Sequence, residues 1–229
     1  MSALPLGPPV DPTPAQRPGR VALKGRHGRL EKLGPQHAGD LWSVVQGHDH
    51  IWTYMSSYGP FSDGASFTEW VGSRTPLADP YSYAVIDPSG RAVGITTLME
   101  IRPPARSVEV GHIVYSPALQ RTPLGTEAQY LLARYAFETL GNRRYEWKCN
   151  ALNAASRRAA LRYGFTFEGV LRQHSIAKGR SRDTAFYSML DSEWPQRKTA
   201  FERWLSPDNF DTQGRQKASL SALNGASAR

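Results

Sequence analysis

Two periods of apolar residues run along the chain, and together they predict an alternation of strands and helices. Residues 81–86, 92–101 and 108–115 are rich in β-branched and aromatic side chains, which is typical of strands. The turn residues 87–90, Asp-Pro-Ser-Gly, join the first two runs into a hairpin. Residues 21–33 precede them and predict an opening strand or hairpin.

Other segments place apolar residues at helical spacing. Residues 35–47 and 67–74 predict two helices ahead of the hairpin, and residues 128–140 repeat apolar side chains every three or four positions after it. Residues 193–205 predict either a terminal helix or a packed extension. Strands and helices are therefore interleaved along one chain, without an internal repeat.

Strand and helix alternate again in the second half of the chain. Residues 144–149 alternate apolar and polar side chains, which is the period of a strand. Residues 153–163 predict a helix, with Asn153 as its N-cap and Gly164 at the left-handed position that commonly ends a helix. Because strand and helix alternate here, we expect at least one parallel pair in the sheet.

Two final strands, at residues 167–176 and 184–190, complete the pattern. These elements fall within residues 21–195, which we interpret as one domain of the α/β (α+β) class. Residues 1–20 are rich in proline, and we expect them to be disordered. We interpret residues 196–229 as a C-terminal extension that is disordered at its end.

The composition is that of a soluble globular domain. Of the 229 residues, 40% are hydrophobic and 10% aromatic, enough for a sizeable core, and the mean hydropathy is −0.49. No apolar run approaches the ~20 residues of a membrane helix, and the N-terminus lacks the features of a signal peptide. Cys149 is the single cysteine, so no disulfide can form within the chain. We expect a cytoplasmic protein with no membrane partner.

The chain is strongly basic, with a formal net charge of +8 and an isoelectric point of about 9.8. A basic surface attracts phosphates, polyanionic cofactors or nucleic acid, but it can equally be a solvated surface with no dedicated partner. The arginines are spread along the chain, and the sequence has no RNA-binding signature, so we do not expect a nucleic-acid partner.

A candidate anion site follows the strand at residues 108–115. Thr122-Pro123 is a natural helix start, with threonine as N-cap and proline at the first helical position. The N–H groups of the first helical turn would then be free to bind an anion. They belong to Leu124, Gly125 and Thr126. Arg121 stands beside them and adds a positive charge, although an ordinary capped helix has the same pattern.

A second candidate site lies at the start of the helix at residues 153–163. Asn153 can cap the helix, or its amide can hydrogen-bond a ligand. Ser156 can donate a proton to a leaving group, or it can be an exposed hydroxyl of the first turn. The sequence by itself leaves both alternatives open.

Five short motifs follow one another along the chain: Glu109-Val110-Gly111-His112, Thr126-Glu127-Ala128, Asn153-Ala154-Ala155-Ser156, Tyr163-Gly164-Phe165, and Phe167-Glu168-Gly169 running into Arg172. In this order and spacing they resemble the GNAT superfamily of acetyl-CoA-dependent acyltransferases. They are most similar to its Rim-type branch, the ribosomal-protein alanine N-acetyltransferases. The resemblance extends over roughly residues 21–195. It implies a mixed, mostly antiparallel sheet of about seven strands flanked by helices, and transfer of an acetyl group to an amine.

The resemblance also implies where the cosubstrate, acetyl-CoA, binds. Its pantetheine arm would follow the strand at residues 108–115, and its pyrophosphate would lie on the loop and helix start after that strand. The implied cofactor-binding residues are Ile113, Val114, Tyr115, Arg121, Thr122, Leu124, Gly125, Thr126 and Asn153. Ser156 would face the sulfur of the thioester.

Three residues depart from the family's pattern. Arg121 and Pro123 stand where the pyrophosphate loop usually has a Gly-x-Gly pattern, and a proline has no N–H to donate. Ala160 stands where many members carry a tyrosine acid. The Rim-type branch tends to use the serine at the position of Ser156 instead.

An amine that attacks a thioester must lose a proton, and two residues are candidate bases. Glu109 lies in an otherwise apolar strand, where burial can raise its pKa; it is either the base or a structural carboxylate paired with an arginine. His112 is the second candidate, and alternation along the strand puts it on the opposite face from Glu109. We predict Glu109 and Ser156 as the catalytic residues. We predict no metal, because the histidines have no convincing acidic or cysteine partners.

The acceptor is a primary amine, either a protein N-terminus or a small molecule. Two other functions stay open: a non-catalytic module that binds CoA, and a basic protein associated with the ribosome or RNA. The basic segment 178–183 is either a solvated turn or a site for an acidic acceptor or the cofactor's 3′-phosphate. Trp42, Trp52 and Trp70 form either a helix core or an aromatic wall of the acceptor pocket. A monomer and a homodimer both fit the sequence.

Overall fold

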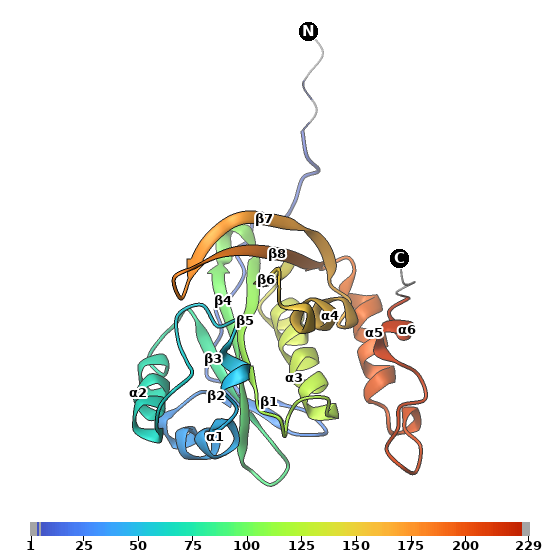
Figure 1. Cartoon of the computed structure of the whole chain (residues 1–229). Helices are drawn as coiled ribbons and strands as arrows, with labels where there is room; N and C mark the ends of the chain where they lie inside the picture. The colour runs from blue at the N-terminus through green and yellow to red at the C-terminus, as the bar shows by residue number, and fades with distance from the viewer. Residues whose placement is uncertain (1–3, 5, 226–229) are drawn as a thin grey trace.

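Eight strands form a single sheet in the order β1-β2-β3-β4-β5-β6-β8-β7, and helices cover both of its faces (Figure 1). The strands are β1 (Leu23–Lys24), β2 (Arg29–Lys32), β3 (Tyr81–Ile86), β4 (Ala92–Arg102), β5 (Ser107–Tyr115), β6 (Arg144–Asn150), β7 (Thr166–Ala177) and β8 (Arg180–Leu190). Every neighbouring pair is antiparallel except β5 and β6, which are parallel. The predicted mixed, mostly antiparallel sheet is confirmed. It has eight strands instead of about seven because the opening segment forms two short strands.

The computed structural model describes residue 4 and residues 6–225, so the disorder predicted for residues 1–3, 5 and 226–229 lies outside the described residues. The helices are α1 (Ala38–Val45), α2 (Gly64–Arg74), α3 (Pro123–Arg134), α4 (Ala154–Arg162), α5 (Trp194–Leu205) and α6 (Leu220–Leu223). Short 3-10 turns lie at Pro35–His37, Asp49–Trp52, Pro103–Ala105 and Pro207–Asn209, and a π-helical turn, Tyr135–Thr139, continues α3. None of the described helices is long and apolar enough to cross a membrane.

The sheet separates two hydrophobic cores. On one face α1 and α2 pack against side chains such as Ala84 and Ile86 of β3. On the other face α3, α4 and α5 form the larger core with side chains such as Val85 of the same strand. Successive residues of β3 therefore point to opposite faces, as the pleat of a strand requires, and all six residues of this strand are buried.

The C-terminal helices belong to the larger core. Phe201 of α5 and Leu220 of α6 are both buried in it. The boundary expected at residue 195 falls inside α5. The core therefore continues beyond that boundary without a break.

Part of the Pro-rich N-terminal segment lies against the domain. The N–H of Ala15 donates to the carbonyl of Pro103 at 3.0 Å, and the N–H of Gln16 donates to the carbonyl of Leu140 at 2.7 Å. These bonds attach the segment to the end of β4 and to the end of the π-helical turn that follows α3.

Local sequence sets the helix ends, as predicted for α3 and α4, and Asp63 adds a cap that was not predicted. The Asp63 side chain accepts the N–H of Ser66 at 2.8 Å and caps α2. Thr122 and Asn153 cap α3 and α4 in the same way, each accepting the N–H three residues further on. Gly164 has a φ of 91° just after α4, a conformation that glycine adopts without steric cost.

Glu127 is expected to join the β1–β2 hairpin to α3. Its two buried carboxylate oxygens accept the N–H groups of Arg26 and His27, each at 2.7 Å. In Glu127→Gln the amide nitrogen would face one of these donors, so we expect the free energy of unfolding to fall by about 1–3 kcal/mol in urea titrations. The exposed Glu69→Gln is the control and should change it by less than about 0.5 kcal/mol. Equal effects in both variants would contradict the assigned role.

Candidate active site

A gap opens between β5 and β6. The two strands pair in parallel over four residue pairs, from Ser107 with Arg144 to Val110 with Trp147. Beyond this point β5 continues to Tyr115 and pairs only with β4, whereas β6 continues and pairs only with β8. Backbone groups on the two facing edges are therefore left for a ligand or water to satisfy. Ile113, Val114 and Tyr115, which are predicted to contact the cofactor, lie along one of these edges.

A β-bulge in β5 changes which side chains share a face. The pairing with β4 shifts by one residue between Val114 and Gly111, and His112 has a φ of 47°. Glu109 is opposite Met99, and a Cβ added at Gly111 would lie 2.6 Å from the Met99 sulfur. The predicted placement of Glu109 and His112 on opposite faces is wrong, because the extra residue restores His112 to the face that Glu109 occupies.

The start of α3 offers fewer free donors than the sequence suggested. The N–H of Gly125 donates to the Thr122 hydroxyl at 3.1 Å, and the N–H of Thr126 donates to the Thr122 carbonyl at 3.4 Å. Within the part of the chain that the structure describes, the N–H of Leu124 has no hydrogen-bond partner. Of the three predicted donors, only Leu124 is therefore available to an anion, because the helix cap uses the other two.

Gly125 has a packing role at the start of α3. A Cβ at this position would lie 2.9 Å from the carbonyl oxygen of Leu119. The Tyr115 hydroxyl also donates to the Gly125 carbonyl at 3.0 Å. The absent side chain therefore makes room for the loop's own backbone, and the predicted contact of Gly125 with the cofactor stays a prediction.

Arg121 adopts the backbone conformation of the glycine that it replaces in the family's pattern. Its φ is 60°, in the left-handed region that glycine favours. Its side chain is exposed, and it forms no ion pair with the described residues. Its guanidinium and the N–H of Leu124 thus leave a reduced anion site at this helix start.

Ser156 accepts one hydrogen bond and has its own proton to donate, with the Cys149 thiol as a neighbour. The indole N–H of Trp147 donates to the Ser156 oxygen at 3.0 Å, so the hydroxyl is an acceptor in this bond. The Asn153 side-chain oxygen accepts the N–H of Ser156 at 3.0 Å, which confirms the N-cap role of Asn153. Its role as a cofactor ligand stays a prediction. Cys149 is buried, and burial raises the pKa of its thiol, which argues against a nucleophile at this position.

Glu109 takes part in a buried charge network. Its carboxylate accepts a hydrogen bond from Lys148 at 2.8 Å, and Lys148 also pairs with Glu146 at 3.0 Å. Arg102 and Arg144 each reach Glu146 at 2.8 Å. Burial raises the pKa of Glu109, and the neighbouring Lys148 opposes that rise. The sequence left open whether Glu109 is a base or a carboxylate with a structural ion pair. In the structure it forms such a pair, with a lysine in place of an arginine. It lies where β5 and β6 are still paired.

His112 lines a small cavity on the same face of the sheet, under α2. The lining residues are Leu33, Tyr58, Trp70, Arg74, Ser82, Ile95, Thr97 and His112. The Tyr58 ring meets the imidazole edge-on, with 5.5 Å between ring centroids. Burial, and then the charges of Arg74 and Arg182, lower the pKa of His112 to about 4, so the imidazole is neutral at pH 7.

Several residues of this cavity were not predicted from the sequence. Arg74 stacks on Tyr58, with its guanidinium carbon 4.9 Å from the ring centroid. Lys178, expected in a solvated turn, donates to two backbone carbonyls of the segment between α1 and α2. Trp70 lines the cavity, whereas Trp52 is fully buried in the core. An excess of aromatic residues at 52–70 is the one sequence signal that pointed here.

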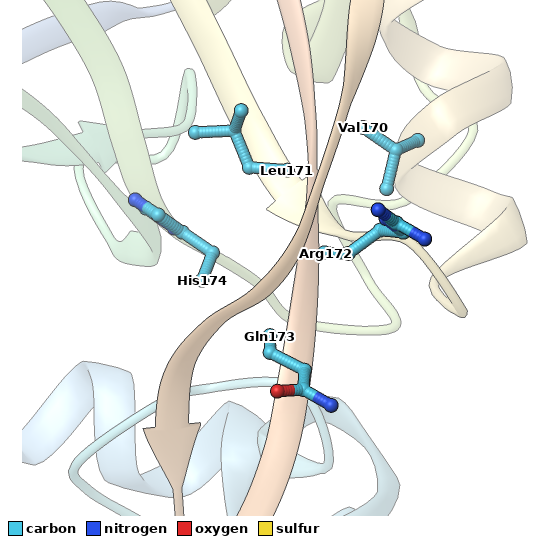
Figure 2. A pocket seen from close by; sticks show the side chains of 5 residues that line it. All are labelled: Val170, Leu171, Arg172, Gln173 and His174. Carbon is cyan, nitrogen blue, oxygen red and sulfur yellow. The ribbon is translucent and has the colours of Figure 1, made fainter.

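A separate open hollow follows β7 at residues 170–174, where this edge strand bulges away from β8. Figure 2 shows Val170 and Arg172 projecting to one side of the strand and Leu171 and His174 to the other. Gln173, at the bulge, donates its N–H to the Asp183 carboxylate at 2.7 Å. No predicted catalytic or cofactor-binding residue lies in this lining. Across the described residues, no group of three or more His, Cys, Asp or Glu side chains is placed to hold a metal ion.

Comparisons with known proteins agree with this geometry. Residues 29–166 match the family described as Acetyltransferase (GNAT) domain. A GCN5-related N-acetyltransferase from Brucella melitensis is 43% identical over 93% of this chain and 98% of its own, with a TM-score of 0.90. A protein of the GNAT family from Chromobacterium violaceum is 38% identical over 85% of this chain and 99% of its own, with a TM-score of 0.78.

The Rim-type enzymes are more distant. RimL, a ribosomal-protein alpha-N-acetyltransferase, is 20% identical over 74% of this chain and 94% of its own, with a TM-score of 0.64, which supports the fold alone. A search of curated proteins finds no match. The chain therefore belongs to the GNAT family of N-acetyltransferases, as its sequence motifs predicted.

Proposed function

We propose that this protein transfers the acetyl group of acetyl-CoA to a primary amine by direct attack, without an acetylated enzyme. The observation that carries the proposal is the gap between β5 and β6, with Ser156 on one side and His112 on the other. GNAT acetyltransferases use acetyl-CoA. Between Ile113 and Tyr115, the backbone groups that do not pair with β4 can pair with the amides of its pantetheine arm as a neighbouring strand would. The Tyr115 carbonyl already accepts the Gln120 side-chain amide at 2.9 Å.

The reaction forms a C–N bond and breaks a C–S bond. The neutral amine attacks the thioester carbonyl, the amine proton passes to a base, and the sulfur leaves as a thiolate that takes up a proton. Each proton transfer by a placed side chain typically contributes ~10²–10⁴-fold to a rate.

Ser156 is the proposed donor to the departing sulfur. Because its oxygen already accepts the Trp147 N–H, its own proton is directed elsewhere. The N-cap bond from Asn153 fixes the backbone of the same turn. The serine is therefore oriented by two bonds before substrate arrives, which lowers the entropic cost of the transfer.

Glu109 and His112 remain the two candidate bases, and the geometry favours His112. The Glu109 carboxylate is bonded to Lys148 where the strands are paired. The His112 imidazole lines a cavity and takes part in no side-chain hydrogen bond of the described residues, so a ring nitrogen is free to accept a proton, but burial and the nearby arginines lower its pKa to about 4 and make it a weak base. We assign Glu109 a structural role in the charge network beside the gap, and we assign His112 the role of the base that accepts the amine proton.

A non-catalytic CoA-binding module is the second candidate function. It is favoured by the reduced set of donors at the start of α3, where Leu124 keeps a free N–H and Pro123 has none. Catalysis separates the two candidates, because both predict that CoA binds.

The test is CoA release from acetyl-CoA over a panel of primary amines, combined with calorimetric titration of acetyl-CoA. We expect micromolar binding and amine-dependent turnover. We expect Ser156→Ala to lower kcat by about 10²-fold while the Kd of acetyl-CoA stays within about threefold. The exposed Ser192→Ala should match the wild type.

Two further variants separate the candidate bases in the same assay. His112→Asn should lower kcat by about 10²-fold, and Glu109→Gln by less than about tenfold. Binding without turnover of any amine would support the non-catalytic module. An unchanged kcat in Ser156→Ala would contradict the proposed role of Ser156 as the acid.

The buried, neutral His112 is expected to make stability depend on pH. Its pKa is lowered from an ordinary 6.5 to about 4, so below pH 6.5 the unfolded chain binds a proton that the folded chain excludes. The contribution of neutral His112 to the free energy of unfolding should therefore be fully present above pH 6.5. It should fall by up to about 3 kcal/mol as the pH decreases to 4. His112→Asn, which tolerates the left-handed backbone, should lose this part of the dependence. Buried His37 is present in both proteins and contributes equally to both pH profiles. Identical profiles of the free energy of unfolding would therefore refute the assigned effect of His112.

A further inference from the structure

We propose that the acceptor amine carries a carboxylate, which Arg74 binds at the edge of the small cavity beside His112, with Arg182 as a second positive charge nearby. The inference rests on the proposed acetyl transfer and names the chemical class of the acceptor. It is drawn from the charge and the unpaired donors of the cavity.

Arg74 has no counter-charge within the described chain. It is partly buried on α2, with its guanidinium 4.9 Å from the Tyr58 ring centroid and 5.6 Å from that of Trp70. No ion pair or side-chain hydrogen bond of the described residues includes it. The stacking holds the planar group in place and leaves its five N–H donors for a ligand.

Arg182 approaches the same histidine from β8. It donates one hydrogen bond to the Ser56 hydroxyl, while its buried Nε has no partner among the described residues. Like Arg74, it belongs to no ion pair of the described chain. The charges of two guanidinium groups from distant parts of the sequence therefore act on one imidazole, and neither group has an anionic partner among the described residues.

The remaining lining also offers donors. The Tyr58 hydroxyl and the Trp70 indole N–H are buried and have no partner among the described residues. Ser82 and Thr97 bond to each other at 3.0 Å. No aspartate or glutamate lines the cavity. A carboxylate, which is an acceptor only, would satisfy these donors and the Arg74 guanidinium.

The positive charges also act on the reacting amine. An ammonium ion would be repelled by Arg74 and Arg182, so the cavity favours the neutral amine that attacks the thioester. A carboxylate on the same molecule supplies the attraction that a bare amine lacks. The Tyr58 ring contacts both Arg74 and His112, so a molecule bound at Arg74 would lie close to the imidazole.

The nearby lysine is already committed. Lys178 donates to the carbonyls of Trp52 and Gly59, at 2.9 and 2.6 Å, and so fastens the β7–β8 turn to the segment that encloses the cavity. Lys178 is therefore not available to an acidic acceptor, and Arg182 is the basic residue of this turn that we assign to it.

The test uses pairs of amines in which a carboxamide replaces the carboxylate, and rates are compared at equal concentrations of the neutral amine. Glycine, β-alanine and 4-aminobutyrate are each compared with their carboxamides. The dipeptide amides Ala-Glu-NH₂ and Ala-Gln-NH₂ form a fourth pair, in which the carboxylate is on a side chain. In the wild type we expect kcat/KM to be at least about tenfold higher for the carboxylate of the preferred pair. The pair with the largest ratio of kcat/KM, carboxylate to carboxamide, shows whether the preferred acceptor is a free amino acid or an acidic peptide.

Arg74→Gln should abolish this preference, because it should lower kcat/KM for the carboxylate by at least about tenfold more than for the matching carboxamide. Arg74→Lys should retain part of it, and Arg203→Gln on the exposed face of α5 is the control. No preference in the wild type, or an equal loss for both members of a pair, would overturn the proposal.

Binding is also measured without turnover, by calorimetric titration of N-acetylglutamate against the neutral N-acetylglutaminamide. Selective binding of the anion that Arg74→Gln removes would support the site even if no amine is acetylated, in which case only the proposed catalysis fails. Equal binding of both compounds would contradict the site, and so would no binding of N-acetylglutamate at concentrations up to about 20 mM. Either result would leave the proposed acetyl transfer intact.

Discussion

The parting of β5 and β6 is the constraint on which the rest of this structure depends. The strands are parallel neighbours up to Val110 and Trp147 and then separate, each keeping its other partner. A parallel pair that ends in the middle of a sheet leaves two facing edges of unsatisfied backbone groups. Such edges are tolerated where a ligand with its own amides can lie between them. The proposed catalytic groups gather at the same place.

Charge is distributed differently on the two sides of this parting. Where the strands are paired, Glu109 and Glu146 are linked through Lys148, and the buried charges offset one another. Where the bulge redirects β5, the charged neighbours of His112 are Arg74 and Arg182, without an acid. The first arrangement stabilises the junction. The second keeps the imidazole neutral and leaves the cavity ready for an anion.

Short-range features could be predicted from the sequence, and long-range ones could not. The caps at Thr122 and Asn153 and the left-handed Gly164 depend on a few neighbouring residues, and all three are confirmed. The bulge at His112 depends on pairing with β4 and was missed, so strict alternation gave the wrong face. The free donors expected at Gly125 and Thr126 were lost to the cap itself.

The acceptor side was the hardest part to foresee, because the residues of the cavity and the nearby Arg182 come from widely separated parts of the chain. Arg74 lies at the end of α2, Tyr58 in the segment before α2, His112 in β5 and Arg182 in β8. No pattern of spacing along the chain relates Arg74 to His112, which lies 112 − 74 = 38 positions later. The family motifs located the strand and the helix start, while the acceptor side became visible only once the sheet was assembled.

The most direct test of the central claim is hydrogen–deuterium exchange with and without saturating acetyl-CoA. If the cosubstrate lies between the parted strands, amides of residues 111–122 and 148–156 should exchange more slowly in its presence, because the ligand satisfies the free edges. The β1–β2 hairpin should exchange as before. Saturated binding that leaves both segments unprotected would contradict the account, since acetyl-CoA would then occupy some other part of the molecule.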